Sequence, residues 1–349
     1  MIDQNDIALM NHPENLLADH WPKALAFEEQ IKTAIVGQDQ AVRLMTITVF
    51  ARGHALLEGG VGVGKTTLLR AAARAIGGEY ERIEGTIDLM PSDLIYYTHL
   101  DEAGKPGVSP GPLLRKGEKL STFFFNEINR ARPQVHSLLL RVMAERSATA
   151  FNREYAFPHL QVFADRNRVE KEETFELPAA ARDRFMLEIP VAPPTAPEVL
   201  DMLAFEPRFH DPDRLLAHVA PGTLDFEGLN DLAAAIQAQV SSSPVLRAYV
   251  RDLWRASIEP DVFGIRLRDA DLGELIEAGP SPRGMSHLIR AARVRAWLEQ
   301  RDHLRPEDVQ AVFPAAMGHR IFLKPVYEYR RAELVPELVE RILRSVAAP

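Results

Sequence analysis

Short apolar runs alternate with longer amphipathic stretches between about residues 54 and 190. Apolar strands separated by helical stretches are typical of a parallel sheet covered by helices, as in βαβ units. The pattern therefore predicts an α/β domain with a central parallel sheet. The runs that we interpret as strands are HALLEGG (54–60), YERIEGT (80–86), STFFFNE (121–127), LQVFAD (160–165) and RFMLEIP (184–190).

The pattern changes at VAPPTAP (191–197), whose prolines remove backbone donors and disfavour a helix before each of them. Beyond this segment apolar residues recur three and four positions apart, which indicates amphipathic helices. We therefore predict a first domain over 1–190 that includes a helical segment at its amino terminus, a linker over 191–197 and a small all-helical domain over 198–349. The clearest helical stretches are 228–240, 243–258, 281–300, 305–317 and 332–346.

The motif GGVGVGKTT (59–67) follows a predicted strand and precedes a predicted helix, which is the context of a phosphate-binding P-loop. Glycines let several backbone N–H groups face one phosphate, and the following helix offers its positive end. Lys65 is expected to reach the outer phosphates and Thr66 to hold Mg²⁺. The predicted phosphate-binding residues are Gly62, Val63, Gly64, Lys65, Thr66 and Thr67. This motif alone leaves kinases, GTPases and motor proteins open.

Several further blocks resemble the MoxR branch of the AAA+ ATPases, over about residues 35 to 320. The stretch FFFNEINRARPQVHSLLLRVMAER is similar to that family's Walker B strand and following helix, although the family has aspartate where this chain has Asn126. The resemblance implies an AAA+ core followed by a helical lid, with ATP and Mg²⁺ as cofactors. The other blocks are IVGQDQAV (35–42), DLMPSDL (88–94), SPGPLL (109–114), LPAAARDRF (177–185) and SPRG (281–284).

The resemblance also implies roles for individual residues. Val36 and Gly37 belong to the segment whose backbone cradles adenine, and Thr66 and Asn126 occupy the metal positions. Glu127 would orient and activate the attacking water. Asn167 matches the family's sensor-1 asparagine, but its flanking residues differ from the family's, so a solvated charged loop is the alternative.

Two arginines complete the implied site. Arg184 would be an arginine finger that serves the nucleotide of the neighbouring subunit, with Arg182 as the rival candidate for this role. Arg283 would be the sensor-2 arginine, which reaches from the lid to the nucleotide of its own subunit. The alternative for each is an ordinary surface or salt-bridged arginine.

Family resemblance further implies a homo-oligomeric, hexameric ring that hydrolyses ATP to remodel or mature a partner. The expected partners are a separate von Willebrand A-domain protein and a client enzyme, with a contribution to metal or cofactor insertion. Two alternatives remain open. One is a nucleotide-gated scaffold with little or no hydrolysis, because Asn126 replaces the aspartate, and the other is an AAA+ subunit of a metal chelatase.

Asn126 offers Mg²⁺ a neutral oxygen where aspartate would offer a charge, so we expect a slow ATPase with a raised magnesium demand. Asp165 ends a neighbouring strand, and its carboxylate could compensate by facing the same metal, whereas a solvent-facing Asp165 is the alternative.

Charge and hydropathy bear on nucleic-acid binding and on localisation. The formal net charge of −8 argues against a broad nucleic-acid-binding face. The amino terminus has no basic segment followed by an apolar one, and no apolar run is long enough for a membrane span. We therefore expect a cytoplasmic protein.

Overall fold

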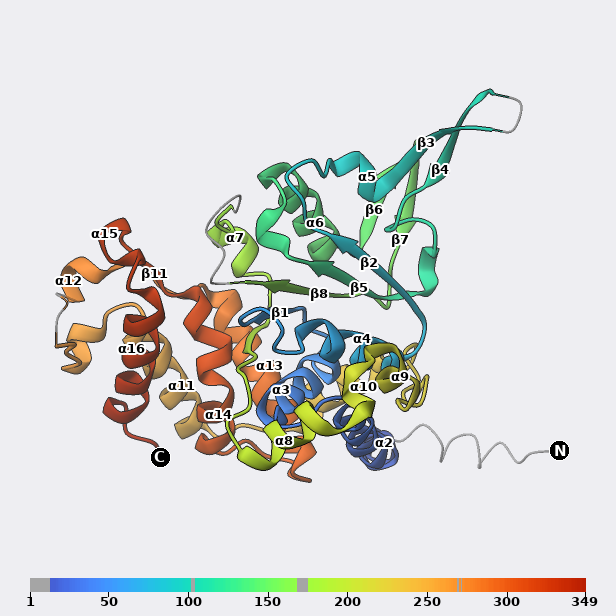
Figure 1. The fold of residues 1–349 in the computed structure, drawn as a ribbon. Coiled ribbons are helices and arrows are strands. Elements are labelled where there is room, and N and C mark those ends of the chain that lie inside the picture. Colours follow the sequence, from blue (N-terminus) through green and yellow to red (C-terminus); the bar gives the residue numbers. More distant parts are fainter. Residues whose placement is uncertain (1–12, 102–103, 168–174, 269, 271) are drawn as a thin grey trace. The chain divides into compact units, whose positions relative to one another are not determined.

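The computed structural model describes residues 13–101, 104–167, 175–268, 270 and 272–349 (Figure 1). The chain divides into two compact units. We call Lys23–Arg184 with Ile189–Asn230 the P-loop unit. The remainder, which is the chain up to Pro22, Phe185–Glu188 and Asp231–Pro349, is the helical unit. Residues 198–230, which the sequence pattern assigned to the helical domain, thus lie in the P-loop unit.

A five-stranded sheet with the order β2-β5-β8-β1-β9 forms the centre of the P-loop unit. The pairings of β2 with β5, β5 with β8 and β8 with β1 are all parallel. In Figure 1, α6 (Pro133–Glu145) lies on one face of this sheet, and α3 (Asp39–Phe50) and α4 (Lys65–Ile76) lie on the other. The predicted strands and the central parallel sheet are confirmed. The strands are β1 (Ala55–Glu58), β2 (Glu79–Glu84), β5 (Leu120–Asn126), β8 (Gln161–Arg166) and β9 (Leu187–Pro190).

Two antiparallel hairpins are inserted along the chain between strands of this sheet. The first joins β3 (Tyr96–Leu100) to β4 (Pro106–Pro110), and the second joins β6 (Ser147–Ala150) to β7 (Arg153–Ala156). The first hairpin lies in a glycine- and proline-rich part of the sequence, residues 98–112. The shorter helices before residue 220 are α5 (Pro91–Ile95), α7 (Ala179–Arg182), α8 (Pro197–Phe205) and α9 (Pro212–Ala217), and a longer helix, α2, covers Pro13–Ala34.

The helical unit is built from amphipathic helices that coincide with the predicted stretches. It also contains a small antiparallel pair, β10 (Ile276–Ala278) with β11 (Phe322–Leu323), which the helical periodicity does not reveal. The start of α2 is tied to this unit, because Trp21 Nε1 donates to the Leu298 carbonyl at 2.9 Å. Its helices are α10 (Leu229–Gln239), α11 (Pro244–Ala256), α12 (Leu272–Leu275), α13 (Pro282–Leu298), α14 (Pro306–Met317), α15 (Pro325–Glu328) and α16 (Arg331–Ser345).

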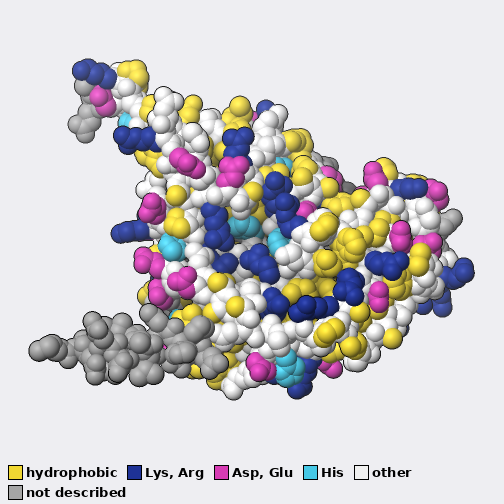
Figure 2. Space-filling view, turned by 180° about the vertical axis from the view of Figure 1, so that it is seen from behind, with side chains coloured by type: hydrophobic (Ala, Val, Ile, Leu, Met, Phe, Trp, Pro, Cys, Tyr) yellow, Lys and Arg dark blue, Asp and Glu magenta, His cyan; other side chains and the backbone are white. Residues whose placement is uncertain are grey.

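A groove of about 590 Å³ lies along α11 and α13. Its lining combines apolar side chains, such as Leu246 and Ile289, with several arginines. Burial and the nearby charge of Arg247 lower the pKa of Arg293. Figure 2 shows hydrophobic and basic side chains gathered together on one face of the molecule. The groove is therefore both apolar and strongly basic.

Asp308 is the buried acid that organises the start of α14. It is 0% exposed, and its carboxylate accepts from Arg295 Nη1 at 2.7 Å and from Arg301 Nη2 at 2.6 Å. Burial alone would raise its pKa, but hydrogen bonds from Arg301 and the Arg305 backbone hold it below the ordinary value of 3.8. The ionised Asp308 carboxylate therefore stabilises the folded protein at pH values above 3.8. This stabilisation is lost as the pH falls through the pKa that Asp308 has in the folded state.

Asp308→Asn is expected to lower the free energy of unfolding by about 3 to 5 kcal/mol, because it leaves two arginines without their buried anion. Urea unfolding followed by tryptophan fluorescence measures this, since Trp21, Trp254 and Trp297 all lie in the helical unit. Asp302→Asn is the matched control, because the Asp302 side chain is 92% exposed. Equal urea midpoints for the two variants would show that the contacts of Asp308 with the two arginines do not stabilise this unit.

Candidate active site

The P-loop connects β1 to α4 at the carboxyl end of the sheet. Gly62 and Gly64 have φ angles of 75° and 92°, which a residue with a side chain rarely adopts. This backbone lets α4 begin directly at Lys65. Lys65 Nζ donates to the carbonyl oxygens of Gly59 at 2.9 Å and Gly60 at 2.7 Å. The amino-terminal N–H groups of α4 and the lysine charge thus converge where a phosphate would bind.

A cavity of about 310 Å³ lies over the P-loop and the ends of β5 and β8. Parallel strands present their carboxyl ends at one edge, and ligands of open α/β sheets bind there. The structure brings the predicted phosphate, metal and sensor-1 residues, with Glu127, together in this one cavity. Its lining consists of Val61, Gly62, Val63, Gly64, Lys65, Thr66, Thr67, Asn126, Glu127, Asp165 and Asn167.

Glu127 follows β5 in a left-handed backbone conformation, with φ and ψ both 50°. Such a conformation is unfavourable for a residue other than glycine and persists where the surroundings enforce it. Its backbone N–H donates to Asp165 Oδ1 at 2.6 Å, and its carboxylate accepts from Arg130 Nη1 at 3.1 Å. The Glu127 carboxylate is therefore held at the cavity by contacts on both its backbone and its side chain.

Asn126 is buried at the end of β5 and lies opposite Glu84 of β2 in the strand register. Its amide Nδ2 donates to Glu84 Oε1. The amide nitrogen is therefore engaged by the acid, and the amide oxygen is the end that can accept or coordinate. Glu84 is a residue that the sequence analysis did not single out, because its role depends on the pairing of two strands that are distant in sequence.

Asp165 is 3% exposed, so the solvent-facing alternative is wrong. Burial raises its pKa to about 6, partly offset by the Glu127 backbone N–H and the charge of Lys65, while the charges of Glu127 and Glu84 raise it further. Ionisation of Asp165 is thus resisted by its acidic neighbours and favoured by cations. Asn167, two residues on, is also buried and lines the same cavity, so the solvated-loop alternative fails for both residues.

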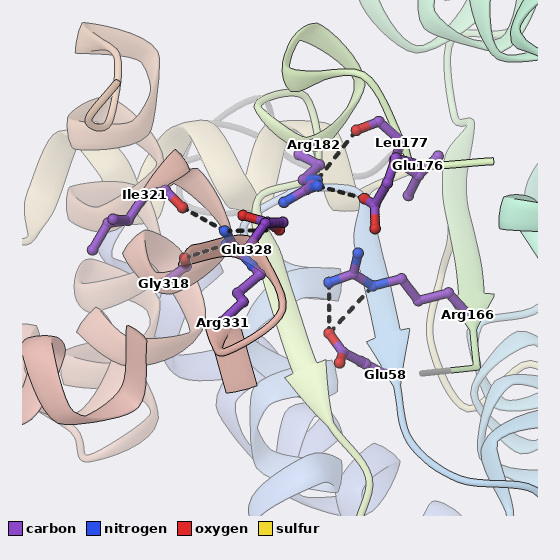
Figure 3. A network of polar contacts seen from close by, with 9 residues as sticks. All are labelled: Glu58, Arg166, Glu176, Leu177, Arg182, Gly318, Ile321, Glu328 and Arg331. Carbon is purple, nitrogen blue, oxygen red and sulfur yellow. Dashed lines mark hydrogen bonds and ion pairs between the residues drawn. The ribbon is translucent and has the colours of Figure 1, made fainter. Parts of the chain in front are cut away.

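Arg166, the charged residue directly before Asn167, has a partner on the neighbouring strand. Arg166 ends β8 and is paired in register with Glu58 at the end of β1. Arg166 Nη2 donates to Glu58 Oε2 at 2.7 Å, as Figure 3 shows. Both side chains are largely buried, so each charge compensates the other inside the protein.

A second cavity of about 360 Å³ adjoins the first, and the two share P-loop residues. Val36 contributes to its lining, as the adenine-binding prediction requires. Gly37 has a φ of 68°, and a Cβ there would lie 2.9 Å from the Pro194 side chain. The sequence analysis missed the opposite wall, which comes from the predicted linker and the helices after it. These lining residues are Pro193, Pro194, Leu203, Phe209, Pro212 and Leu215.

Arg182 and Arg184 differ sharply in environment. Arg182 is 5% exposed, and it donates to Glu176 Oε2 at 2.6 Å and to the Leu177 carbonyl (Figure 3). Arg184 is only half-buried and donates to the carbonyl of Ala180, one turn away, at 2.9 Å. Arg182 is thus committed to contacts inside its own unit, and Arg184 is the better placed of the two to meet another molecule.

Arg283 lies in the helical unit, in the first turn of α13. The helix begins after Ser281, whose side chain accepts from the Gly284 N–H at 3.3 Å. Arg331 of the same unit, by contrast, has a structural role, because it donates to the carbonyl oxygens of Ile321 and Gly318 (Figure 3). Contact of Arg283 with a nucleotide stays a prediction.

Comparison with known proteins identifies the family. A sequence profile of the ATPase family associated with various cellular activities (AAA) matches residues 54–187, and a profile of the AAA lid domain matches residues 269–342. The chain is 60% identical over 338 residues to Protein MoxR of Methylorubrum extorquens, covering 97% of this chain and 98% of that protein. The chain belongs to the MoxR family of AAA+ ATPases.

Other relatives agree with this assignment to the MoxR family. The chain is 34% identical over 323 residues to Chaperone MoxR1 of Mycobacterium tuberculosis, covering 92% of this chain and 81% of that protein. The crystal structure of an inferred ATPase from Cytophaga hutchinsonii superposes with a TM-score of 0.80 at 27% identity, covering 96% of this chain and 98% of that one. Within the described part of this MoxR-family chain, no helix is long and apolar enough to cross a membrane.

Proposed function

We propose that the protein hydrolyses ATP as a hexameric ring of identical chains and uses this cycle to remodel or mature a partner protein. The observation that carries the proposal is the cavity that joins the P-loop to Glu127 and Asn167 at the carboxyl ends of β5 and β8. The P-loop, a carboxylate and an amide thus surround one space, which supports roles as an anion site, a general base and a polar contact.

The roles proposed for the side chains come from the family resemblance, and this geometry supports them. The backbone N–H groups of the P-loop and the charge of Lys65 would hold the phosphates, and the adjoining apolar cavity beside Val36 would take the base. The Glu127 carboxylate would accept a hydrogen bond from the attacking water and orient it. Asn167 would hold the same water or the terminal phosphate through its amide.

The residues present also fit a magnesium ion. Thr66, Asn126 and Asp165 line one cavity and offer hydroxyl, amide and carboxylate oxygens, which are the donors that Mg²⁺ prefers. Thr66 and Asn126 would hold the ion together with the phosphates. When bound, it would neutralise phosphate charge during transfer.

The environment of Arg184 supports the proposal that the active site is shared between subunits. It does not line the nucleotide cavity within the described part of its own chain, and it is half-buried with a local backbone contact. Such an arginine can serve the nucleotide of a neighbour in a head-to-tail ring. We propose that Arg283 in the lid reaches the nucleotide of its own subunit.

The remodelling part of the proposal rests on relatedness. The relative from Mycobacterium tuberculosis bears the name chaperone, which supports action on another protein. The proposed partners are a separate von Willebrand A-domain protein and a client enzyme whose metal or cofactor insertion is aided. The proposed second candidate, a nucleotide-gated scaffold, is favoured by Asn126, whose amide is engaged by Glu84 and supplies no charge for a metal.

ATP turnover per chain is expected to rise with protein concentration until the ring is populated, because each site needs a neighbour. Parallel sedimentation measurements would show the oligomer forming over the same range. A turnover per chain that is independent of concentration would contradict the shared site. Binding and assembly without turnover at any concentration would favour the scaffold.

A further inference from the structure

The strand register places Asp165 at the same level as Asn126. β5 and β8 are parallel neighbours, and their pairing runs up to Phe125 opposite Ala164. The next residue on each strand is Asn126 and Asp165. Paired positions of parallel strands direct their side chains to the same face of the sheet. The acid that is missing from the end of β5 is therefore matched by an acid at the same level one strand away.

Asp165 has the burial and the spare acceptor capacity of a cation ligand. It is 3% exposed and lines the cavity that contains Lys65 and Thr66. One carboxylate oxygen, Oδ1, accepts from the Glu127 N–H at 2.6 Å. A carboxylate has about four acceptor sites on two oxygens, so this contact leaves Oδ2 and further lone pairs for an ion.

Asn126 is fixed so that it can act as a neutral ligand beside this acid. Its Nδ2 donates to Glu84, which leaves the amide oxygen as its acceptor. Glu84 is 50% exposed and is also paired with Arg82 at 2.8 Å, so its own charge is partly compensated. Glu84 is therefore a positioning residue for the amide, whereas Asp165 carries the buried negative charge.

We propose that Asp165 supplies the anionic magnesium ligand that Asn126 cannot supply, so that the acid of the metal site has moved from β5 to β8. This inference rests on the proposed nucleotide site. It predicts that the two positions are interchangeable in charge. One acid at either position is sufficient, and an amide at both positions is not.

The test uses Mn²⁺ as the probe, with a non-hydrolysable ATP analogue, and measures bound Mn²⁺ by electron paramagnetic resonance. Asp165→Asn is expected to weaken Mn²⁺ binding to the protein–nucleotide complex about tenfold, because a charged ligand contact becomes a neutral one. Asn126→Asp in that background, made together with Glu84→Gln so that two carboxylates do not face each other, is expected to restore the affinity to within about threefold of wild type. Asp88→Asn, on an exposed side chain of the same unit, is the matched control.

The substitution of Asp165 by asparagine separates a ligand role from a structural one. Asparagine keeps the shape and an oxygen that can still accept from the Glu127 N–H. If Asp165 only holds that backbone, Mn²⁺ affinity will equal wild type, and the proposal is overturned. Restoration by Asn126→Asp with Glu84→Gln cannot come from misfolding, and its failure would equally overturn the proposal. If the Mn²⁺ pattern holds but wild type never turns over ATP, the metal assignment stands and the proposed hydrolysis does not.

Discussion

Glu127→Gln is expected to lower ATP turnover by about 10² to 10⁴ while ATP still binds, because glutamine cannot accept a proton from the attacking water. The amide oxygen can still accept from Arg130, as the carboxylate does at 3.1 Å, so the side chain should keep its place. Single-turnover hydrolysis and binding of a fluorescent ATP analogue measure the two effects separately. Glu118→Gln, on an exposed glutamate of the same unit, should match wild type in both.

The same variant also tests the proposed partner. Held in its ATP state, tagged Glu127→Gln protein should retain more of a dedicated partner during purification from the native host than wild type does. Recovery of general chaperones alone would count against a dedicated client. Wild-type turnover in the variant would show that another group orients the water.

The sheet could be predicted from sequence because its inner strands β1, β5 and β8 are buried on both faces. The three successive phenylalanines in LSTFFFN, which forms β5, are typical of a central strand of a parallel sheet. The P-loop could also be predicted from the sequence, since Gly62 and Gly64 have the positive φ angles that favour glycine. In both cases a local sequence pattern directly reflects a local physical constraint.

The wall of the second cavity could not be predicted in this way. Prolines such as Pro193 and Pro194 indicate where a helix cannot form, but they do not indicate what the segment packs against. The structure places them with Leu203 and Phe209 beside the P-loop residues. The prolines therefore mark a break in the pattern, whereas residues 198–230 after this break lie in the P-loop unit through tertiary packing.

The contacts that compensate or hold the polar groups at the site could not be predicted from the sequence either. Glu58 and Arg166 are 108 positions apart, and Glu84 and Asn126 are 42 apart. Each pair is created by the order and register of the strands. The charge of Arg166, directly before Asn167, can thus be interpreted only once β1 and β8 are known to be neighbours.

Replacing Arg184 with alanine is expected to lower turnover by about 10³ to 10⁵, the range found for arginines that stabilise transition-state charge. Nucleotide affinity should change little, because Arg184 does not line the cavity in the described part of its own chain. Arg182→Ala should act differently and destabilise the fold, since it leaves Glu176 and the Leu177 carbonyl without their buried donor. Arg153→Ala, on an exposed side chain of β7, is the control for removal of a surface arginine.

Mixing two inactive variants distinguishes a shared site from an ordinary loss of function. Arg184→Ala chains bind ATP but lack the arginine, whereas Lys65→Ala chains keep Arg184 but lose the lysine that holds the phosphates. In randomly mixed head-to-tail rings, about one quarter of the interfaces combine an intact P-loop with an intact Arg184. The mixture should therefore hydrolyse ATP although neither variant does so alone. If subunit exchange is demonstrated and the mixture stays inactive, Arg184 acts within its own chain, because only a residue that serves a neighbour can be supplied by one.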